Sequence, residues 1–135
     1  MQNGRRTEKL LLEGPGARVV AIVDEGEECQ VTDFLEALSE RRPSAFAKIQ
    51  ALIGMVAEIG PEKIRNKEKV KSLGDGLYEL KAHQVRIFWC YGPSSGGQRR
   101  VVLLYGLIKK KDRHSSKDMK RARELKRAYE QGMAR

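Results

Sequence analysis

The chain has 135 residues, 40% of them hydrophobic, which is enough for one domain with a modest packed core. Its 27 lysines and arginines against 18 aspartates and glutamates give a formal net charge of +9. The composition excludes a wholly disordered chain, and the lack of an apolar run of transmembrane length excludes a membrane-spanning protein. Since the first residues also lack the apolar core of a signal peptide, we expect a cytoplasmic protein that contacts no membrane.

The positive charge is concentrated in the second half of the chain. Residues 1–62 carry 7 basic and 11 acidic side chains, a balance of −4, whereas residues 63–135 carry 20 basic and 7 acidic ones, a balance of +13. This asymmetry favours a polyanionic partner for the second half. A basic solvated face, or a surface that meets an acidic protein, would explain the charge about as well.

The first part of the chain is expected to contain a tail, a strand and two helices. Residues 1–16 contain three glycines and a proline among charges, which predicts a flexible tail before a single domain of residues 17–135. Ala17 to Asp24 is apolar and β-branched, so it predicts a strand. Val31 to Leu38 and Phe46 to Ile59 each show the 3.6-residue apolar period of a helix.

Capping residues predict where these helices begin and end. Thr32 is a candidate cap for the first helix. Pro43 either ends that helix or opens the second, and Gly60 followed by Pro61 ends the second. The lysine-rich segment from Pro61 to Gly76 is expected to be a polar lead into the sheet.

Three strand-like runs follow, and the chain is organised around them. They begin at Leu77, Val85 and Arg99 and read LYELKA, VRIFWCYG and RRVVLLYGLIKK. A tight turn at His83 separates the first two, and the stretch from Gly92 to Gln98 is typical of a loop. We therefore predict three successive antiparallel strands.

Alternation within these strands predicts which side chains share a face. Trp89 falls on one face of the second strand, while Arg86 and Phe88 fall on the other. In the third strand Tyr105 falls on the face of Leu103, and both faces are apolar, which is typical of a central strand.

The last segment, Ser115 to Gly132, is predicted to be a very basic helix, since Ser115 and Asp118 resemble a capping box. The element order is strand, helix, helix, three strands, helix. This order indicates an α+β fold in which a helical hairpin supports an antiparallel sheet.

Few residues are suited to metal or redox chemistry. Cys29 and Cys90 match no metal-binding or redox spacing, so we expect two free thiols. His83 and His114 are the only histidines, and neither pairs with a cysteine or carboxylate at ligand spacing. We expect no metal and no other cofactor.

Cations gather near the ends of the predicted strands instead. Such a group can hold a phosphodiester and stabilise the charge that develops during its cleavage, and a lysine with a lowered pKa can act as acid or base. In RNA the 2′-hydroxyl can be the nucleophile, so this chemistry needs no metal. A solvated surface charge is nevertheless the commoner role of any single lysine. The residues concerned are Lys67, Lys69, Lys71, Lys81, Arg86, Lys109, Lys110 and Lys111.

Arg86 is more informative because it interrupts an apolar strand. A buried guanidinium needs an anionic partner, and either a phosphate or an ion pair with Glu79 would provide one. Tyr105 is a candidate for stacking on a base, whereas Trp89 is expected in the core. His114 lies where a proton donor would be useful, although we favour an exposed loop position for it.

The strand motifs resemble a known family. The runs GDGLYELK, VRIFWCY and RRVVLLYGLIKK, followed by a basic terminal helix, are similar to those of the RelE/HigB superfamily of type II toxin–antitoxin toxins. The likeness is greatest to the phage-derived Gp49-like branch and extends over roughly Val19 to Tyr129.

This resemblance implies a RelE-like microdomain with a curved antiparallel sheet packed on a helical hairpin. It also implies a toxin that cuts mRNA on the ribosome, and a neutralising antitoxin with a helix-turn-helix domain that joins it in a hetero-oligomer. One branch of the superfamily poisons DNA gyrase without cutting RNA. Inhibition by binding therefore stays open, as does a basic RNA-binding module without toxicity.

Motif positions carry over residue by residue. Arg86 matches the strand arginine, Lys81 matches the basic residue that closes the LYELK strand, and Tyr105 departs from the histidine that relatives often have before the glycine. The implied catalytic set is Lys67, Lys71, Lys81, Arg86 and Lys110. The residues expected to contact RNA are Lys69, Lys109, Lys111, Tyr105 and His114.

Overall fold

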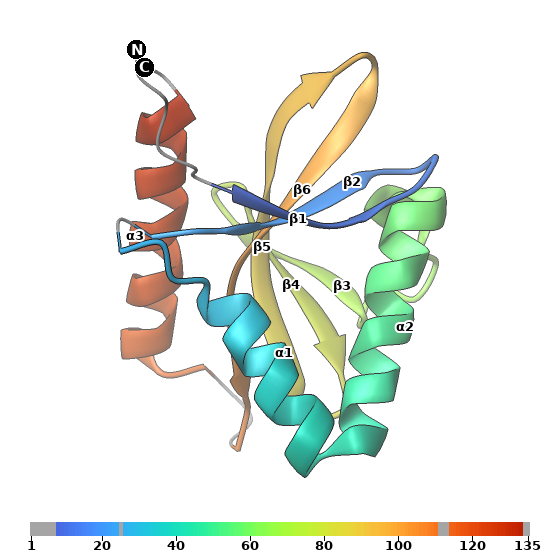
Figure 1. Cartoon of the computed structure of the whole chain (residues 1–135), viewed down its shortest axis with the longest axis vertical. Coiled ribbons are helices and arrows are strands. Elements are labelled where there is room, and N and C mark those ends of the chain that lie inside the picture. The colour runs from blue at the N-terminus through green and yellow to red at the C-terminus, as the bar shows by residue number, and fades with distance from the viewer. Residues whose placement is uncertain (1–7, 25, 111–113, 134–135) are drawn as a thin grey trace.

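A single mixed sheet of six strands, in the order β1-β2-β6-β5-β4-β3, forms the centre of the fold (Figure 1). The computed structural model describes residues 8–24, 26–110 and 114–133. Its elements are β1 (Glu8–Glu13), β2 (Arg18–Ile22), α1 (Gln30–Arg41), α2 (Pro43–Ile59), the 3₁₀ helix η1 (Pro61–Lys63), β3 (Val70–Gly74), β4 (Leu77–Ala82), β5 (Val85–Ser95), β6 (Gln98–Ile108) and α3 (Ser116–Met133).

The predicted α+β class is confirmed, and the element order agrees with a RelE-like microdomain. The expectation of a purely antiparallel sheet is wrong at one place, because β2 pairs with β6 in parallel. Strand β6 therefore lies between β2 and β5, and this central position explains why both of its faces are apolar.

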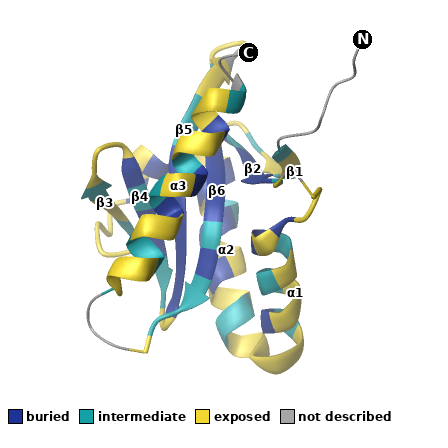
Figure 2. Ribbon diagram, turned by 90° about the vertical axis from the view of Figure 1, so that its left-hand side faces the viewer, coloured by how far each residue is buried: buried dark blue, intermediate teal, exposed yellow. Residues whose placement is uncertain are grey.

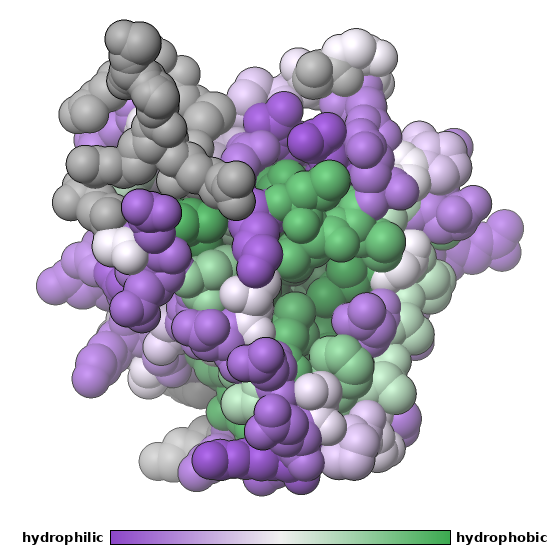
Figure 3. All heavy atoms as spheres, in the orientation of Figure 1, coloured by the Kyte–Doolittle hydropathy of each residue, from purple (hydrophilic) through white to green (hydrophobic). Residues whose placement is uncertain are grey.

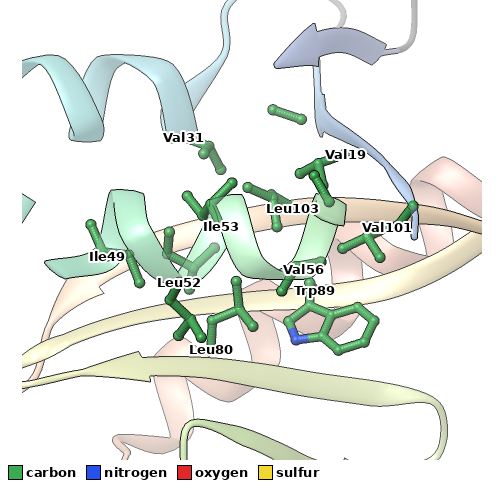
Figure 4. Close-up of a cluster of buried hydrophobic side chains, with 14 of the residues drawn as sticks. Val19, Val31, Ile49, Leu52, Ile53, Val56, Leu80, Trp89, Val101 and Leu103 are labelled. Carbon is green, nitrogen blue, oxygen red and sulfur yellow. The ribbon is translucent and has the colours of Figure 1, made fainter. Parts of the chain in front are cut away.

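Helices cover both faces of the sheet. The hairpin of α1 and α2 packs on one face, where Figure 4 shows Val56 and Leu80 beside the indole of Trp89. Helix α3 packs on the other face through Ala122, Leu125 and a buried tyrosine (Figure 2). Within the described ranges, no helix is long and apolar enough to cross a membrane.

Part of the predicted tail belongs to the sheet. Residues 8–13 form the edge strand β1 and pair with β2, so the prediction of a flexible tail is wrong for them; residues 1–7 lie outside the described residues. The Glu8 carboxylate accepts hydrogen bonds from Arg100 at 3.1 Å and from the Tyr129 hydroxyl at 2.8 Å. These contacts hold β1 against β6 and α3. Sequence periodicity does not predict long-range contacts of this kind.

One side of the molecule exposes apolar side chains. Leu10 and Leu12 of β1 and Met55 and Ile59 of α2 are each about 40% exposed or more. Figure 3 shows apolar surface between the β1–β2 hairpin and α2.

The strands extend further than predicted at two places. The polar lead into the sheet contains a short strand, β3, on the far edge. The predicted loop from Gly92 to Gln98 is mostly strand, because β5 and β6 continue to a two-residue turn at Gly96 and Gly97, whose φ angles are 59° and 78°. Glycine adopts such positive angles without steric cost. The predicted tight turn at His83 is confirmed.

A β-bulge changes the alternation along β6. Phe88 faces Tyr105 and Trp89 faces Leu103, so Leu104 is an extra residue in β6. The prediction that Tyr105 shares a face with Leu103 is therefore wrong, and Tyr105 packs on the α3 side with Phe88.

The helix starts agree with the predictions in part. Pro43 is the first residue of α2, where its missing N–H costs nothing. The first helix begins two residues before Thr32, whose hydroxyl donates to the Cys29 carbonyl instead of capping the helix.

Helix α1 is hydrogen-bonded to β6 at Gly106. The Gln30 side chain donates to the Gly106 carbonyl at 2.7 Å and accepts from the Gly106 N–H at 2.8 Å, and so continues the ladder beyond the end of β2. The Phe34 ring covers the same glycine, and a Cβ placed there would lie 2.5 Å from a ring carbon.

We predict that Gly106→Ala lowers the free energy of unfolding by about 1–3 kcal/mol, because the added methyl forces the Phe34 ring to move. Gly54→Ala is the matched control. Gly54 lies within α2 with no atom within 4 Å of an added Cβ, so alanine there should stabilise the fold by about 0.5–1 kcal/mol. Urea unfolding of both variants measures the two effects. Equal stabilities would contradict the packing of Phe34 on Gly106.

Candidate functional site

Basic residues from several segments lie at the end of the sheet formed by the β4–β5 turn, which is the lower end in Figure 1. The α1–α2 junction, the start of β3 and the end of β6 meet there. The Lys109 N–H donates to the Gln84 carbonyl at 2.7 Å and brings the end of β6 to this turn. We call this region the basic end. Its cationic residues and its histidine are Arg42, Lys48, Lys69, Lys81, His83, Arg86, Lys109 and Lys110.

Two pockets open at the basic end. One, of about 430 Å³, lies between α2 and β4 and contains Lys48, Lys69, Lys81 and His83 in its lining. The other, of about 380 Å³, lies on the opposite side of the turn and is lined in part by Arg42 and His83. Among the described residues, no carboxylate lines either pocket. Both pockets therefore favour an anion.

Lys81 and Arg86 are two predicted site residues that the structure places side by side. They face each other directly across β4 and β5. Side chains at such positions share one face of the sheet and lie about 5 Å apart at their Cβ atoms. Two cations at this spacing repel each other, so an anion between them would be stabilising. In the free protein Lys81 pairs with Glu68 at 3.6 Å.

Arg86 is buried, with 7% of its surface exposed. Its Nη1 donates to the carbonyl of Val85 at 3.0 Å and to that of His83, and its Nε has no partner. The predicted alternative, an ion pair with Glu79, is wrong. Within the described residues, Arg86 forms an ion pair with no carboxylate.

Glu79 pairs instead with His114. The His114 Nε2 contacts the Glu79 carboxylate, and the side chains are 9% and 4% exposed. The imidazole lies 4.9 Å from the Phe88 ring. The interpretation of His114 as an exposed loop residue is therefore wrong: it joins the start of α3 to the sheet. Its Nδ1 is buried and has no partner among the described atoms.

Sequence reasoning missed Lys48 and His83. The ammonium of Lys48 contacts Nε2 of His83, and both side chains are exposed. Lys48, Ala51 and Met55 recur at helical spacing along the side of α2 that faces the pocket. That spacing was visible in the sequence. The pairing of this helix side with the β4–β5 turn, however, depends on how the helical hairpin lies on the sheet.

The other predicted site residues are divided between regions. Lys67 and Lys71 line a separate pocket with Tyr78 and Trp89, and Tyr105 lies on the α3 side opposite Phe88. Lys110 follows Lys109 at the basic end, and Lys111 lies outside the described residues. The predicted catalytic set thus does not converge as one group: Lys81 and Arg86 face each other, Lys110 lies at the same end, and Lys67 and Lys71 lie elsewhere.

The described part of the chain has no cluster that could bind a metal, and its two cysteines are buried. No group of three or more histidines, cysteines or carboxylates able to hold a metal ion occurs there. Cys29 and Cys90 are both free, as predicted, and both are buried. Burial raises the pKa of Cys90 to about 12, an effect that Lys126 opposes and Glu130 reinforces. Cys90 is therefore a thiol at neutral pH and a poor nucleophile.

A comparison with models of protein families matches most of the chain to a known family. The family model described as phage derived protein Gp49-like (DUF891) matches residues 33–127, which include α2, β3 to β6 and most of α1 and α3. No curated protein matches the chain.

We predict that His114→Ala lowers the free energy of unfolding by about 3 kcal/mol, because it leaves the Glu79 carboxylate buried without its partner. His83→Ala removes the other histidine, which is exposed, and should change stability by less than about 0.5 kcal/mol. Adding Glu79→Leu to His114→Ala should recover part of the loss. Wild-type stability of His114→Ala would show that the pair does not hold α3 to the sheet.

We also predict that Cys90 resists alkylation by iodoacetamide in the native protein at pH 8, since its raised pKa leaves little thiolate. The measurement uses a Cys29→Ser variant, so that only one thiol is present. The same variant in 6 M guanidinium chloride provides the control and should react fully. Rapid modification of the native variant would contradict the burial of Cys90.

Proposed function

Because the chain belongs to the phage-derived Gp49-like family, a family of toxin–antitoxin toxins of the RelE/HigB type, we propose that it is a toxin that cuts mRNA on the ribosome. Membership in this family implies an antitoxin partner. We further propose that the antitoxin carries a helix-turn-helix domain, and that the basic end binds the phosphodiester that is cut.

The observation that carries this proposal is the environment of Arg86. A buried guanidinium normally has a carboxylate partner, since an uncompensated buried charge is costly. Arg86 has backbone carbonyls for Nη1 and an unpartnered Nε, and it faces a second cation, Lys81. A phosphate would satisfy both cations at once, and a guanidinium can bind phosphate through two parallel hydrogen bonds.

The chemistry follows from these groups. The 2′-oxygen attacks the adjacent phosphorus, the bond to the 5′-oxygen breaks, and a 2′,3′-cyclic phosphate and a 5′-hydroxyl are left. Lys81 and Arg86 stabilise the negative charge of the pentacovalent phosphate. One member of the Lys48–His83 pair accepts the 2′ proton, and the other gives a proton to the leaving oxygen. Lys69, Lys109 and Lys110 hold flanking phosphates.

We expect Arg86→Ala and Lys81→Ala to lower the cleavage rate by about 100-fold or more, because each removes a charge that stabilises the transition state. His83→Ala should lower it as well. Each variant is expressed briefly in a bacterial host, and primer extension on abundant transcripts maps new 5′ ends. Lys9→Ala, at an exposed lysine of β1, removes the same charge at the opposite edge of the sheet and should cleave like wild type.

Circular dichroism separates lost chemistry from lost folding, which matters because Arg86 is buried. Lys81 is half-buried near the end of β4, so its variant is expected to fold. New 5′ ends in register with codons would support cleavage on the ribosome. Intact transcripts in cells that stop growing would overturn the nuclease and leave a toxin that inhibits by binding. A folded, fully active Arg86→Ala variant would remove that residue from the mechanism.

A further inference from the structure

A third pocket, of about 520 Å³, lies further along the sheet from the basic end. We call it the aromatic pocket. The sheet face that carries the helical hairpin forms its floor, and η1 and the segment before β3 form its wall. Its lining is Pro61, Glu62, Lys67, Glu68, Val70, Lys71, Ser72, Tyr78, Trp89 and Tyr91. None of the proposed chemistry at the basic end uses it.

Its floor is a stack of aromatic rings that ends one strand before the edge of the sheet. Tyr78 and Trp89 are direct neighbours across β4 and β5, and their rings stack with centroids 4.6 Å apart and planes 22° apart. Tyr91 meets both rings edge-on. The next position across the sheet, opposite Tyr78 on the edge strand β3, is Ser72. A serine is too small to cover the outer face of the Tyr78 ring, so a third planar ring fits there.

The charges around the aromatic pocket favour an anionic ligand. The Glu62 carboxylate accepts from the Tyr91 hydroxyl at 3.1 Å and pairs with Arg99 at 3.4 Å. The other acidic side chain of the lining, Glu68, pairs with Lys81. Among the described residues, Lys67 and Lys71 form no ion pair. Lys71 lies opposite Glu79, on the other face of the sheet from Tyr78, so Lys67 is the free cation of the lining on the aromatic side.

We propose that the aromatic pocket holds an unpaired base of single-stranded RNA, stacked on Tyr78 above Ser72, with Lys67 on a neighbouring phosphate. Aromatic side chains bind bases of any sequence by stacking, and cations beside them hold the backbone. The choice of RNA as ligand rests on the proposed function. The stacking site itself rests on the geometry.

The two sites are close enough for one strand. Tyr78 precedes Lys81 by three residues along β4, which is about 10 Å at the rise of a β-strand, and alternation puts the two side chains on opposite faces of the sheet. A strand that reaches both sites therefore passes round the edge strand β3, with a phosphate at the basic end and a base a few nucleotides away in the aromatic pocket. A free mononucleotide would lack the second attachment and should bind more weakly.

Trp89 provides a direct measurement because it is the only tryptophan of the chain and belongs to the stack. The full chain is titrated with an eight-nucleotide oligoadenylate RNA and, separately, with AMP, while tryptophan emission is followed. We expect the RNA to change the emission and AMP to bind at least tenfold more weakly. AMP that binds as tightly as the RNA would overturn the assignment to a strand.

Ser72→Tyr is the decisive variant, because a tyrosine would occupy the proposed position of the base, and tyrosine is favoured in strands. It should weaken RNA binding about tenfold or more. Ser94→Tyr, at an exposed position of β5, makes the same change elsewhere and should bind like wild type. Should Ser72→Tyr fail to fold, Tyr78→Leu removes the stacking surface and should weaken binding equally.

The outcomes separate this inference from the proposed function. Wild-type affinity of folded Ser72→Tyr or Tyr78→Leu would overturn the aromatic pocket and leave the chemistry of the basic end untouched. Intact transcripts in expressing cells, together with RNA binding that Ser72→Tyr abolishes, would overturn the nuclease and leave the pocket. The Arg86→Ala variant should retain the Ser72-dependent binding while it loses cleavage.

Discussion

The burial of β6 on both faces is the constraint on which the rest of the fold depends. A strand in this position cannot face water on either side, so the helical hairpin must cover one face and α3 the other. Its neighbours are β2 in parallel and β5 antiparallel. Where β6 ends at Ile108, the cover ends too, and the lysines that follow can reach solvent. The basic end lies at that place because the core stops there.

The buried position of Arg86 is unfavourable for the stability of the fold. Arg86 lies on β5 beside β6, with Leu107 opposite it, and its guanidinium is buried without a carboxylate among the described residues. A hydrophobic residue would suit that position better for stability alone. Local violations of the packing rules that bring no evident structural gain are typical of functional sites. The same reasoning does not extend to Glu79, since His114 satisfies its carboxylate within the fold.

Strong periodicity made much of the fold predictable, and its absence explains the errors. The apolar periods of α1, α2, β4 and β5 came from residues that face a core, so their patterns were clear. Strand β1 was missed because two of its leucines, Leu10 and Leu12, are exposed and its ends are charged. The bulge at Leu104 was invisible because both faces of β6 are apolar. The Lys48–His83 contact joins segments 35 residues apart, and no local pattern encodes such a contact.

The lysines before β4 lie close together in the sequence but line two different pockets. The sequence placed Lys67, Lys69 and Lys71 together, yet Lys69 lines the pocket at the basic end, whereas Lys67 and Lys71 line the aromatic pocket. The backbone turns at residues 67–69, just before β3 starts. Glu68 lies between them and pairs with Lys81. An RNA phosphate that displaced this carboxylate would bind Lys81 and leave Glu68 unpaired in the lining of the aromatic pocket. Binding at the basic end would therefore make the aromatic pocket more negative.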